Sequence, residues 1–362
     1  MKNVFLVMGT RPEAIKMAPV YRALKKTPGL SITVISTGQH RELLAQAMQA
    51  FDMSPDIDLQ VMRPGQSLSA LTCSILEGLE KTFERHRPDL VLAHGDTTTC
   101  FSAALSCFYH RIPIAHVEAG LRTYRIDSPF PEEFNRQGVA KLAGFHFAPD
   151  AQAKDNLLRE GVSPIDVCVT GSTAVDAIDA ISEIRRPSKS HCDLSADKPV
   201  SVITLHRREN GSETLKGMLT GIKNAARLHP EMTFVYPMHP NPSVRRTVLE
   251  VLSTIPNLVL REPMEYRDFI GLMARATVVI TDSGGIQEEA DYLRKRVLLL
   301  REHTERVNGL GEGRTCIVGT NSEAITAAIS RSLTSHLEAP SDAVPHESPS
   351  LKIAREIVKR LA

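Results

Sequence analysis

The sequence predicts an α/β protein built from two Rossmann-like domains, each a doubly wound parallel sheet. Short runs of Val, Ile and Leu recur along the chain, apolar at successive positions as in strands buried on both faces. Amphipathic segments separate most of these runs, which is the alternation of βαβ units. The 362 residues exceed what one hydrophobic core usually organises, so two domains are expected.

The elements follow from the same patterns. Buried parallel strands are expected at residues 4–8, 31–36, 90–93, 114–117, 167–170, 200–205, 233–237, 258–260, 277–280 and 297–300. Helices are expected at residues 14–26, 68–86 and 215–228, where the apolar positions follow a helical period.

The domain boundary is expected where the strand pattern stops. Charged and small residues fill positions 182–198, which places a hinge near 171–198. The first domain is therefore predicted to span residues 1–170 and the second residues 171–349. The amphipathic segment 350–362 is expected to form a last helix that joins the first domain.

The composition excludes several classes of function. Lys and Arg number 43 against 42 Asp and Glu, so no global field favours nucleic acid or an anionic membrane. The apolar run at residues 1–8 is too short for a signal peptide or a spanning helix, and a cytoplasmic location is expected. The six cysteines form no CxxC pair and no cluster at zinc spacing, so free thiols are expected.

The loop after the first strand has the features of an anion site. Gly9 permits a tight turn, Pro12 opens a helix, and Arg11 and Lys16 flank the helix N-terminus. The loop lacks the G-x-G-x-x-G fingerprint, which disfavours a Rossmann oxidoreductase. A basic surface turn is the alternative.

Acidic residues also follow strands, where open parallel sheets bind ligands. His94 with Asp96, and His116 with Glu118, are each two residues apart and are expected to converge at neighbouring strand ends. Asp96 could also cap the following helix. A metal site is a weaker alternative, because no second His pair accompanies these residues.

A third acidic pair, Glu132 and Glu133, begins a predicted helix. The helix dipole favours acidic residues there, so a structural role is possible for both. Arg136 lies four residues after Glu132 on the same helix face, which favours a functional cluster.

Two loops of the second half carry phosphate-binding chemistry. Residues 206–210 (HRREN) end a strand with many donors, although a solvated charged loop would look similar. Residues 283–285 (SGG) present backbone N–H groups at a helix start, which suits a diphosphate better than a plain tight turn. Glu289, one turn further, could accept hydrogen bonds from both ribose hydroxyls.

Along nearly its whole length the chain resembles the non-hydrolysing UDP-N-acetylglucosamine 2-epimerases, whose fold is of the GT-B type. The matching stretches are GTRPEAIKMAP (9–19), GQHRELL (38–44), HGDTTT (94–99), HVEAGLRT (116–123), SPFPEEFNR (128–136), HRREN (206–210) and TDSGGIQEEA (281–290). The resemblance implies two domains that face each other across a cleft and close on the ligand, and a homodimer.

The resemblance also implies roles for individual residues. The implied catalytic residues are Asp96, Glu118, Glu132 and His206. The implied substrate-binding residues are Arg11, Lys16, Arg136, Phe269, Ser283, Gly284, Gly285, Glu289 and Arg306, with Phe269 stacked on uracil. Gln39, Arg207 and His239 match an allosteric site, and neither a metal nor a cofactor is implied.

The implied reaction is the reversible conversion of UDP-N-acetylglucosamine to UDP-N-acetylmannosamine through 2-acetamidoglucal, which supplies precursors of cell-surface polysaccharide. UDP is eliminated and added back, and the order in which the carboxylates act stays open. The alternatives are a hydrolysing epimerase, an epimerase of a modified UDP-sugar, a GT-B glycosyltransferase and a non-catalytic nucleotide-sugar sensor. The three carboxylates favour catalysis over the last two.

Overall fold

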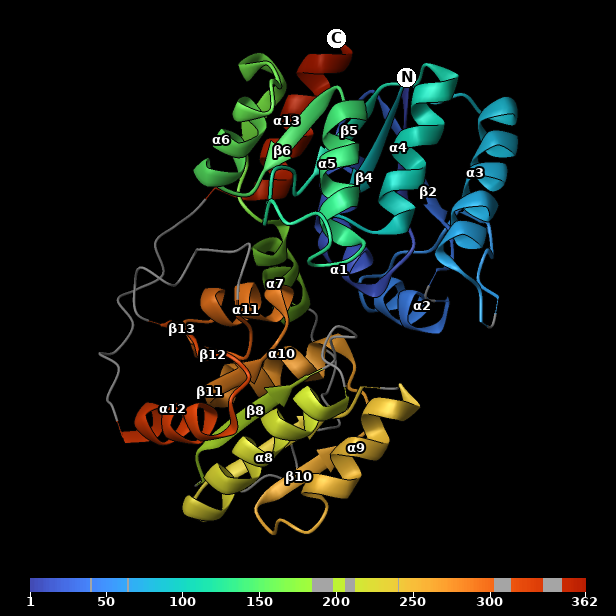
Figure 1. Cartoon of the computed structure of the whole chain (residues 1–362). Helices are drawn as coiled ribbons and strands as arrows, with labels where there is room; N and C mark the ends of the chain where they lie inside the picture. The colour runs from blue at the N-terminus through green and yellow to red at the C-terminus, as the bar shows by residue number, and fades with distance from the viewer. Residues whose placement is uncertain are drawn as a thin grey trace. The chain divides into compact units, whose positions relative to one another are not determined.

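The structure is a computed structural model that describes residues 1–39, 41–63, 65–183, 198–205, 212–239, 241–302, 314–334 and 347–362. The chain divides into two compact units, residues 1–184 with 346–362 and residues 185–345. Each unit contains one parallel sheet with helices on both faces (Figure 1). The predicted α/β class with two doubly wound sheets is confirmed.

The first unit contains a seven-stranded sheet in the order β3-β2-β1-β4-β5-β6-β7. Its elements are β1 (Lys2–Met8), α1 (Arg11–Lys25), β2 (Leu30–Ser36), α2 (Arg41–Ala50), β3 (Ile57–Asp58), α3 (Leu68–Arg85), β4 (Leu90–His94), α4 (Thr98–His110), β5 (Ile114–Val117), α5 (Glu132–Leu142), β6 (Phe145–Ala148), α6 (Ala151–Arg159), the 3-10 turn η1 (Pro164–Asp166), β7 (Val167–Val169), α7 (Thr173–Glu183) and the C-terminal α13 (Pro349–Leu361).

The register of this sheet brings three loops together. Val7 of β1 pairs with Ala93 of β4, and Ala93 pairs with His116 of β5, all in parallel. The carboxyl ends of the three strands therefore lie at one edge, where parallel sheets of this kind bind ligands. The loops that begin at Gly9, Gly95 and Glu118 all start from this edge.

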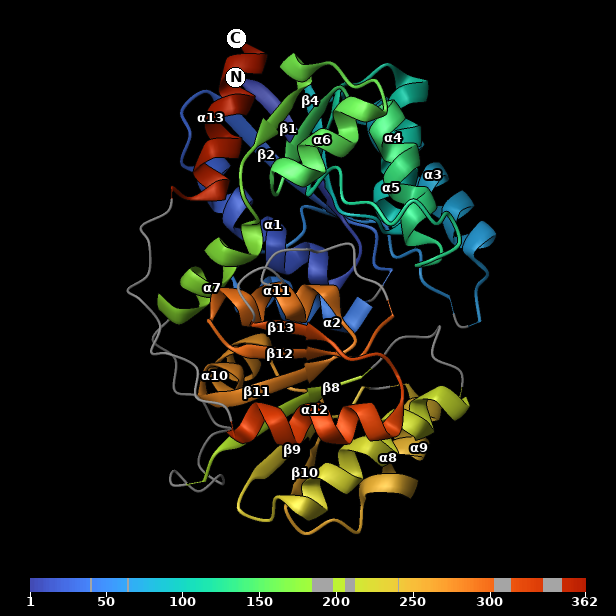
Figure 2. The same cartoon turned by 60° about the vertical axis from the view of Figure 1, so that its left-hand side comes forward.

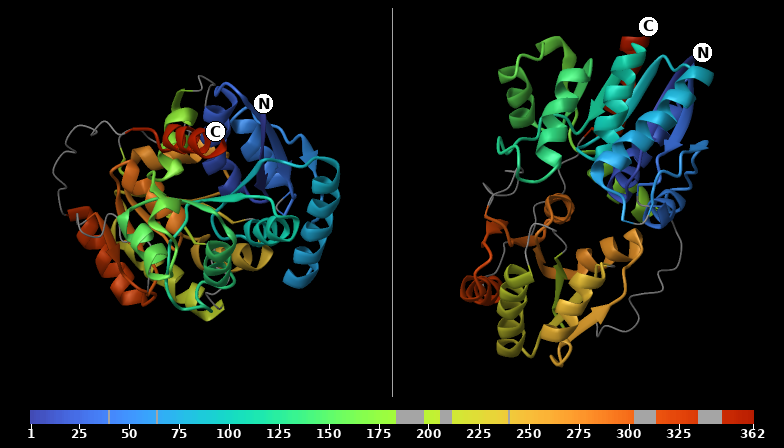
Figure 3. Two further views of the ribbon diagram at one scale, coloured as in Figure 1. Left: turned by 90° about the horizontal axis from the view of Figure 1, so that it is seen from above. Right: turned by 45° about the vertical axis from the view of Figure 1, so that its right-hand side comes forward.

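Helices cover both faces of the first sheet. On one face α3, α4 and α5 pack side by side, and their apolar residues form a core with β1, β4 and β5. On the other face α1 contacts α2, α7 and α13. The C-terminal helix, red in Figures 1 and 3, thus returns to the first unit.

The helix α7 lies with the first unit, beyond the sequence-derived boundary at residue 170. Asp176 of α7 accepts hydrogen bonds from the Ser348 hydroxyl at 2.9 Å and from the Ser350 amide at 2.6 Å. These contacts fix α7 to the start of α13. Apolar residues of α7, among them Ile178 and Ile181, are buried against the same unit.

The second unit contains a six-stranded sheet in the order β10-β9-β8-β11-β12-β13. Its elements are β8 (Val200–Thr204), α8 (Ser212–Leu228), β9 (Thr233–Pro237), α9 (Pro242–Leu252), β10 (Leu258–Arg261), α10 (Tyr266–Arg275), β11 (Ala276–Thr281), α11 (Gly284–Tyr292), β12 (Arg296–Leu299), β13 (Thr315–Ile317) and α12 (Ser322–Thr334). Helices α8, α9 and α12 pack on one face and share a core with the strands (Figure 2).

The strand pattern predicts the ten longer or fully apolar strands but not β3, β6 or β13. β3 has only two residues, and β13 is as short as β7 but begins with the polar Thr315 in place of an apolar residue. β6 reads Phe-His-Phe-Ala, and its histidine breaks the apolar run although it is buried. Among the helices of the described segments, none is long and apolar enough to cross a membrane.

Candidate active site

The loop after β1 is packed so closely that only glycine fits at its start. A Cβ atom on Gly9 would lie 2.1 Å from Thr99 Oγ1 and 2.3 Å from Thr37 Oγ1, two hydroxyls that contact each other at 2.9 Å. Thr10 is the N-cap of α1, and Pro12 occupies its first turn. The predicted turn and helix start are therefore confirmed, with Arg11 as the first helical residue.

Glu13, which was not a predicted site residue, ties this loop to the next one. Its Oε2 accepts hydrogen bonds from the backbone N–H groups of Gly9 at 3.0 Å and Thr10 at 2.8 Å. Its Oε1 accepts one from the Thr97 hydroxyl at 2.8 Å. Glu13 is 1% exposed, and burial raises the pKa of its carboxyl to about 7 in spite of these donors.

The pH dependence of stability should reflect this shift. The folded state keeps the Glu13 proton up to about pH 7, whereas the ordinary pKa of a glutamate is 4.5, so its stabilising contribution is complete below pH 4.5 and is lost as the pH rises through 7. We expect the free energy of unfolding of wild type, taken relative to that of Glu13→Gln, to fall by on the order of 3 kcal/mol between pH 4.5 and 8. Urea titrations across this range measure it, and parallel pH profiles for the two proteins would contradict it.

Lys16 and Glu118 form a buried ion pair. Lys16 Nζ contacts Glu118 Oε1, and the side chains are 7% and 9% exposed. Glu118 has a φ of 63°, in the left-handed region that non-glycine residues rarely adopt. Such backbone conformations persist where surrounding contacts enforce them, often at functional sites. His94 Nε2 lies 3.9 Å from Glu118 Oε2, so His94 faces the acid of the neighbouring strand.

His116 contributes to the loop of Asp96 and not to that of Glu118. Its Nε2 lies 2.7 Å from the Gly95 carbonyl oxygen. Burial lowers the pKa of His116 to about 3, so the ring is neutral at physiological pH and Nε2–H donates this hydrogen bond. His116 of β5 thus contacts the loop that follows β4, and His94 of β4 faces Glu118 in the loop that follows β5.

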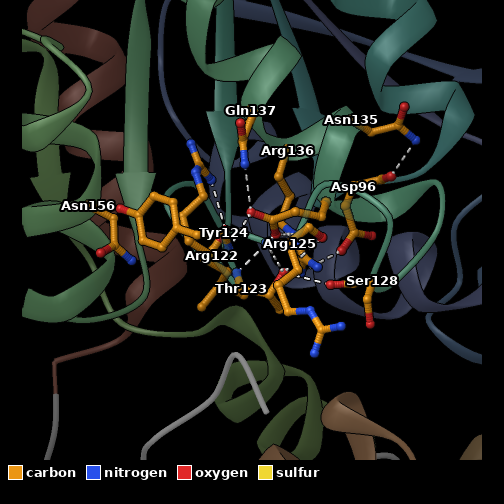
Figure 4. A network of polar contacts seen from close by, with 12 residues as sticks. Asp96, Arg122, Thr123, Tyr124, Arg125, Ser128, Asn135, Arg136, Gln137 and Asn156 are labelled. Carbon is orange, nitrogen blue, oxygen red and sulfur yellow. Dashed lines mark hydrogen bonds and ion pairs between the residues drawn. The ribbon is translucent and has the colours of Figure 1, made fainter. Parts of the chain in front are cut away.

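Asp96 is held by Arg136 and Asn135 of α5 (Figure 4). Arg136 Nη1 lies 3.0 Å from Asp96 Oδ2, and the Asn135 amide donates to the Asp96 carbonyl oxygen at 2.8 Å. Arg136 is 2% exposed, whereas the Asp96 side chain retains 28% exposure. The arginine is therefore fixed inside the protein, and its partner carboxylate reaches solvent.

Glu133, the neighbour of the predicted catalytic Glu132, is a structural residue. Its carboxylate accepts hydrogen bonds from the backbone N–H groups of Thr123 and Tyr124, both at 3.1 Å, and lies 3.2 Å from Arg136 Nε. It is fully buried. Glu132 is the first residue of α5 and is half-buried. Arg136 thus contacts Glu133, three residues before it on α5, and Asp96 in the loop after β4.

The segment after Glu118 is held against α6 and its C-cap residue Glu160. Arg122 binds Glu160 with two nitrogens, at 2.7 and 2.8 Å. Gly120 has a φ of 91°, and a Cβ atom there would lie 2.1 Å from the Ala153 carbonyl oxygen. Only glycine fits such a position, so the direction of the chain beyond Glu118 is fixed.

The carboxylates of the three loops share one electrostatic environment. Cys100 of α4 is buried, and the pKa of its thiol is raised well above the ordinary value, first by burial and then by Glu13, Asp96 and Glu118 among its charged neighbours. A Cβ atom on Gly95 would lie 3.7 Å from Glu118 Oε2, so the Glu118 carboxylate lies beside the loop that carries Asp96, and the joint catalytic role of the two acids stays a prediction. In the part of the chain that the structure describes, no group of three His, Cys, Asp or Glu side chains could hold a metal ion.

In the second unit, residues 281–285 form a strand-to-helix turn. Ser283 is the N-cap of α11, and its backbone N–H donates to Thr281 Oγ1 at 3.0 Å. The Thr204 hydroxyl donates to the same oxygen at 2.7 Å, which links β8 to β11. Gly284 and Gly285 are the first two residues of the helix. The predicted helix start with its backbone donors is thus present.

Glu289 lies on α11, which follows this turn, and Phe269 lies on α10, which precedes β11. Glu289 is 8% exposed, and the Tyr266 hydroxyl donates to its Oε1 at 3.0 Å, which fixes the carboxylate. Phe269 lies on α10 and is 8% exposed, so its ring offers little surface. Stacking of Phe269 on uracil stays a prediction.

Of the remaining predicted residues, Gln39 and His239 lie within the described residues. His206, Arg207 and Arg306 lie outside the described residues. Gln39 accepts a hydrogen bond from the Thr99 hydroxyl at 2.9 Å in the first unit. His239 follows β9 in the second unit, and its Nδ1 accepts from the Asn241 N–H at 3.2 Å. The allosteric role of Gln39 and His239 stays a prediction.

Two doubly wound sheets with polar loops at their strand ends are the architecture of GT-B nucleotide-sugar enzymes, and solved structures place the chain in that class. It superposes on a UDP-GlcNAc 2-epimerase from Neisseria meningitidis, solved bound to UDP-GlcNAc, with a TM-score of 0.90, 38% identity and 99% coverage of both chains. The family profile of UDP-N-acetylglucosamine 2-epimerase matches residues 22–349. The chain belongs to this family, and the predicted resemblance is confirmed.

Other relatives agree. A UDP-N-acetylglucosamine 2-epimerase from Yersinia pestis is 45% identical over 92% of this chain and 90% of its own length. The UDP-GlcNAc 2-epimerase from Methanocaldococcus jannaschii, solved in complex with UDP-GlcNAc and UDP, matches with a TM-score of 0.88 and 29% identity, covering 99% of both chains.

Proposed function

We propose that the protein catalyses the reversible epimerisation of UDP-N-acetylglucosamine at C2, without hydrolysis, to give UDP-N-acetylmannosamine. The observation that carries the proposal is the pair of acids held against buried cations at one sheet edge, Asp96 with Arg136 and Glu118 with Lys16. Inversion at C2 requires one group that removes a proton and one that returns a proton to the opposite face. Two separately anchored carboxylates meet this requirement.

In the proposed step the C2–H bond and the C1–O bond break, and a C1–C2 double bond forms. The proton moves to a carboxylate, UDP leaves with the electron pair of the C1–O bond, and 2-acetamidoglucal remains. A second carboxyl group, in its protonated form, then gives its proton to the other face of C2, and the UDP oxygen adds back to C1. A neighbouring cation favours the ionised form of an acid, so Arg136 and Lys16 stabilise the carboxylate that Asp96 or Glu118 becomes when it gives up a proton. We assign the proton transfers jointly to Asp96, Glu118 and Glu132.

Stabilisation of departing UDP supplies the driving force, because a C2–H group is a weak acid. Backbone N–H groups at a helix start suit a diphosphate, and each unit offers such a start by itself: α1 with Arg11 in the first unit and α11 in the second. His206 and Arg306, which lie outside the described residues, are further proposed donors. No cofactor enters the scheme.

The proposal is tested by phosphorus and proton NMR of UDP-N-acetylglucosamine with the purified protein, with no cofactor or metal added. We expect UDP-N-acetylmannosamine to appear until equilibrium, with only a trace of free UDP. Stoichiometric UDP with free N-acetylmannosamine would assign the protein to the hydrolysing branch. An unchanged spectrum would contradict the proposed substrate and favour a modified UDP-sugar, a transferase or a sensor.

We also propose that the enzyme is a cytoplasmic homodimer that supplies precursors of cell-surface polysaccharide. Exposed aromatic side chains on adjacent helices support self-association: Phe108 and Tyr109 on α4 are 60% and 67% exposed, and Phe134 on α5 is 48% exposed. Light scattering should give about twice the chain mass of 39.8 kDa. A mass of one chain at micromolar concentration would contradict the dimer.

A further inference from the structure

The Glu13 carboxylate is the link between two loops that carry different parts of the proposed chemistry. It accepts from Gly9 and Thr10 at the N-terminus of α1, the helix of Arg11 and Lys16. It also accepts from Thr97, which is the N-cap of α4 and directly follows Asp96. One rigid group therefore sets the position of Asp96 relative to α1.

Thr97 extends the link into α4. Its Oγ1 accepts a hydrogen bond from the Cys100 N–H at 3.0 Å while its hydroxyl proton goes to Glu13. The chain of contacts thus runs from the backbone of the α1 loop through one carboxylate and one hydroxyl to the first turn of α4. Above about pH 7, where Glu13 is ionised, all three partners donate to this buried carboxylate.

Helix capping alone explains only part of this arrangement. A glutamate at the third helical position commonly accepts from the backbone of the N-cap, as Glu13 does with Thr10. Capping does not require a bond to a second loop 84 residues away in sequence. Nor does it require full burial of the carboxylate, which disfavours the charged form.

We propose that Glu13 is a positioning residue for the proposed epimerisation, which holds the loop of Asp96 against the helix of Arg11 and Lys16. It does not touch the sugar. It keeps the acid and the anion-binding helix at a fixed separation, so that proton removal and departure of UDP occur together. The inference rests on the proposed function.

The test compares kcat, KM and the Kd of UDP for Glu13→Gln and Thr97→Val at pH 8. In Glu13→Gln the amide oxygen can keep the two backbone N–H groups, but its NH₂ group then donates to Thr97 Oγ1, so the Thr97 hydroxyl is no longer the donor and the negative charge that held both ends is gone. We expect kcat to fall about 10- to 100-fold in each variant, since small misplacements of catalytic groups have effects of this order. The Kd of UDP should stay within about threefold.

A double variant tests whether the two residues act through one link. If they do, Glu13→Gln with Thr97→Val should be no slower than the slower single variant, because both changes break the same contact. Thr97→Ser keeps the hydroxyl and should retain kcat within about threefold. If the two single effects multiply, or if Thr97→Ser is as slow as Thr97→Val, the positioning role is wrong.

Ser67→Ala is the matched control for loss of a helix cap. Ser67 caps α3 in the same unit, and its Oγ accepts from the Ala70 N–H at 3.2 Å. This variant should lose stability with kcat unchanged. A normal kcat for folded Glu13→Gln and Thr97→Val overturns the inference, whereas wild-type protein without turnover refutes the proposed function instead.

Discussion

Asn at position 96 should lower kcat by about 10³-fold while the Kd of UDP changes by less than about threefold. The amide cannot take the C2 proton, yet it has nearly the shape of the carboxylate. The fold should survive, because Arg136 keeps Glu133 as a second buried partner at 3.2 Å. Steady-state kinetics and calorimetric titration with UDP measure the two quantities.

The control for loss of an ion pair is Asp166→Asn. Asp166 lies 3.0 Å from Arg360 Nη1 in the same unit and is not assigned to the site. Its replacement should leave kcat unchanged. If Asp96→Asn instead abolishes UDP binding, Asp96 serves the ligand or the fold and not proton transfer.

The second large effect is expected for Glu118. Glu118→Gln should lower kcat about 10³-fold and also lower the free energy of unfolding by about 3 kcal/mol, because the buried Lys16 ammonium loses the carboxylate that it contacts. Asp96→Asn should lower the free energy of unfolding much less, since Arg136 still contacts the Glu133 carboxylate. Urea unfolding at pH 7 with steady-state kinetics separates the two effects.

The double variant Lys16→Met with Glu118→Gln distinguishes stability from catalysis. The double variant has no buried ammonium group that has lost its carboxylate, so most of the lost stability should return. Turnover should not return, because no carboxylate occupies the position. Recovery of kcat in the double variant would show that Glu118 matters only as the partner of Lys16.

The sequence predicted the fold well because buried parallel strands contain continuous apolar runs, as at residues 4–8 of β1 and 90–93 of β4. It missed β6 because His146 interrupts the run. Burial of a neutral ring is compatible with the core, since burial lowers the pKa of His146 to about 4. Such a residue carries no signal of burial in a sequence.

The sequence placed acidic side chains at the ends of β4 and β5 but did not predict which residues they contact. Alternation along a strand predicted His116 beside Glu118, yet the left-handed backbone at Glu118 ends the alternation. His116 therefore contacts Gly95, and His94 faces Glu118. Glu13 could have been found, because Thr-x-x-Glu at a helix start is the pattern of a capping box. Its bond to Thr97 depends on packing between distant elements and has no local pattern.

In the proposed reaction C2 inverts by proton transfer with departure and return of UDP. Incubation of the protein with UDP-N-acetylglucosamine in D₂O, with C2 followed by proton NMR, tests this directly. We expect UDP-N-acetylmannosamine with deuterium at C2 and little free UDP, and almost no incorporation with Asp96→Asn. UDP-N-acetylmannosamine that keeps the original hydrogen at C2 would contradict it.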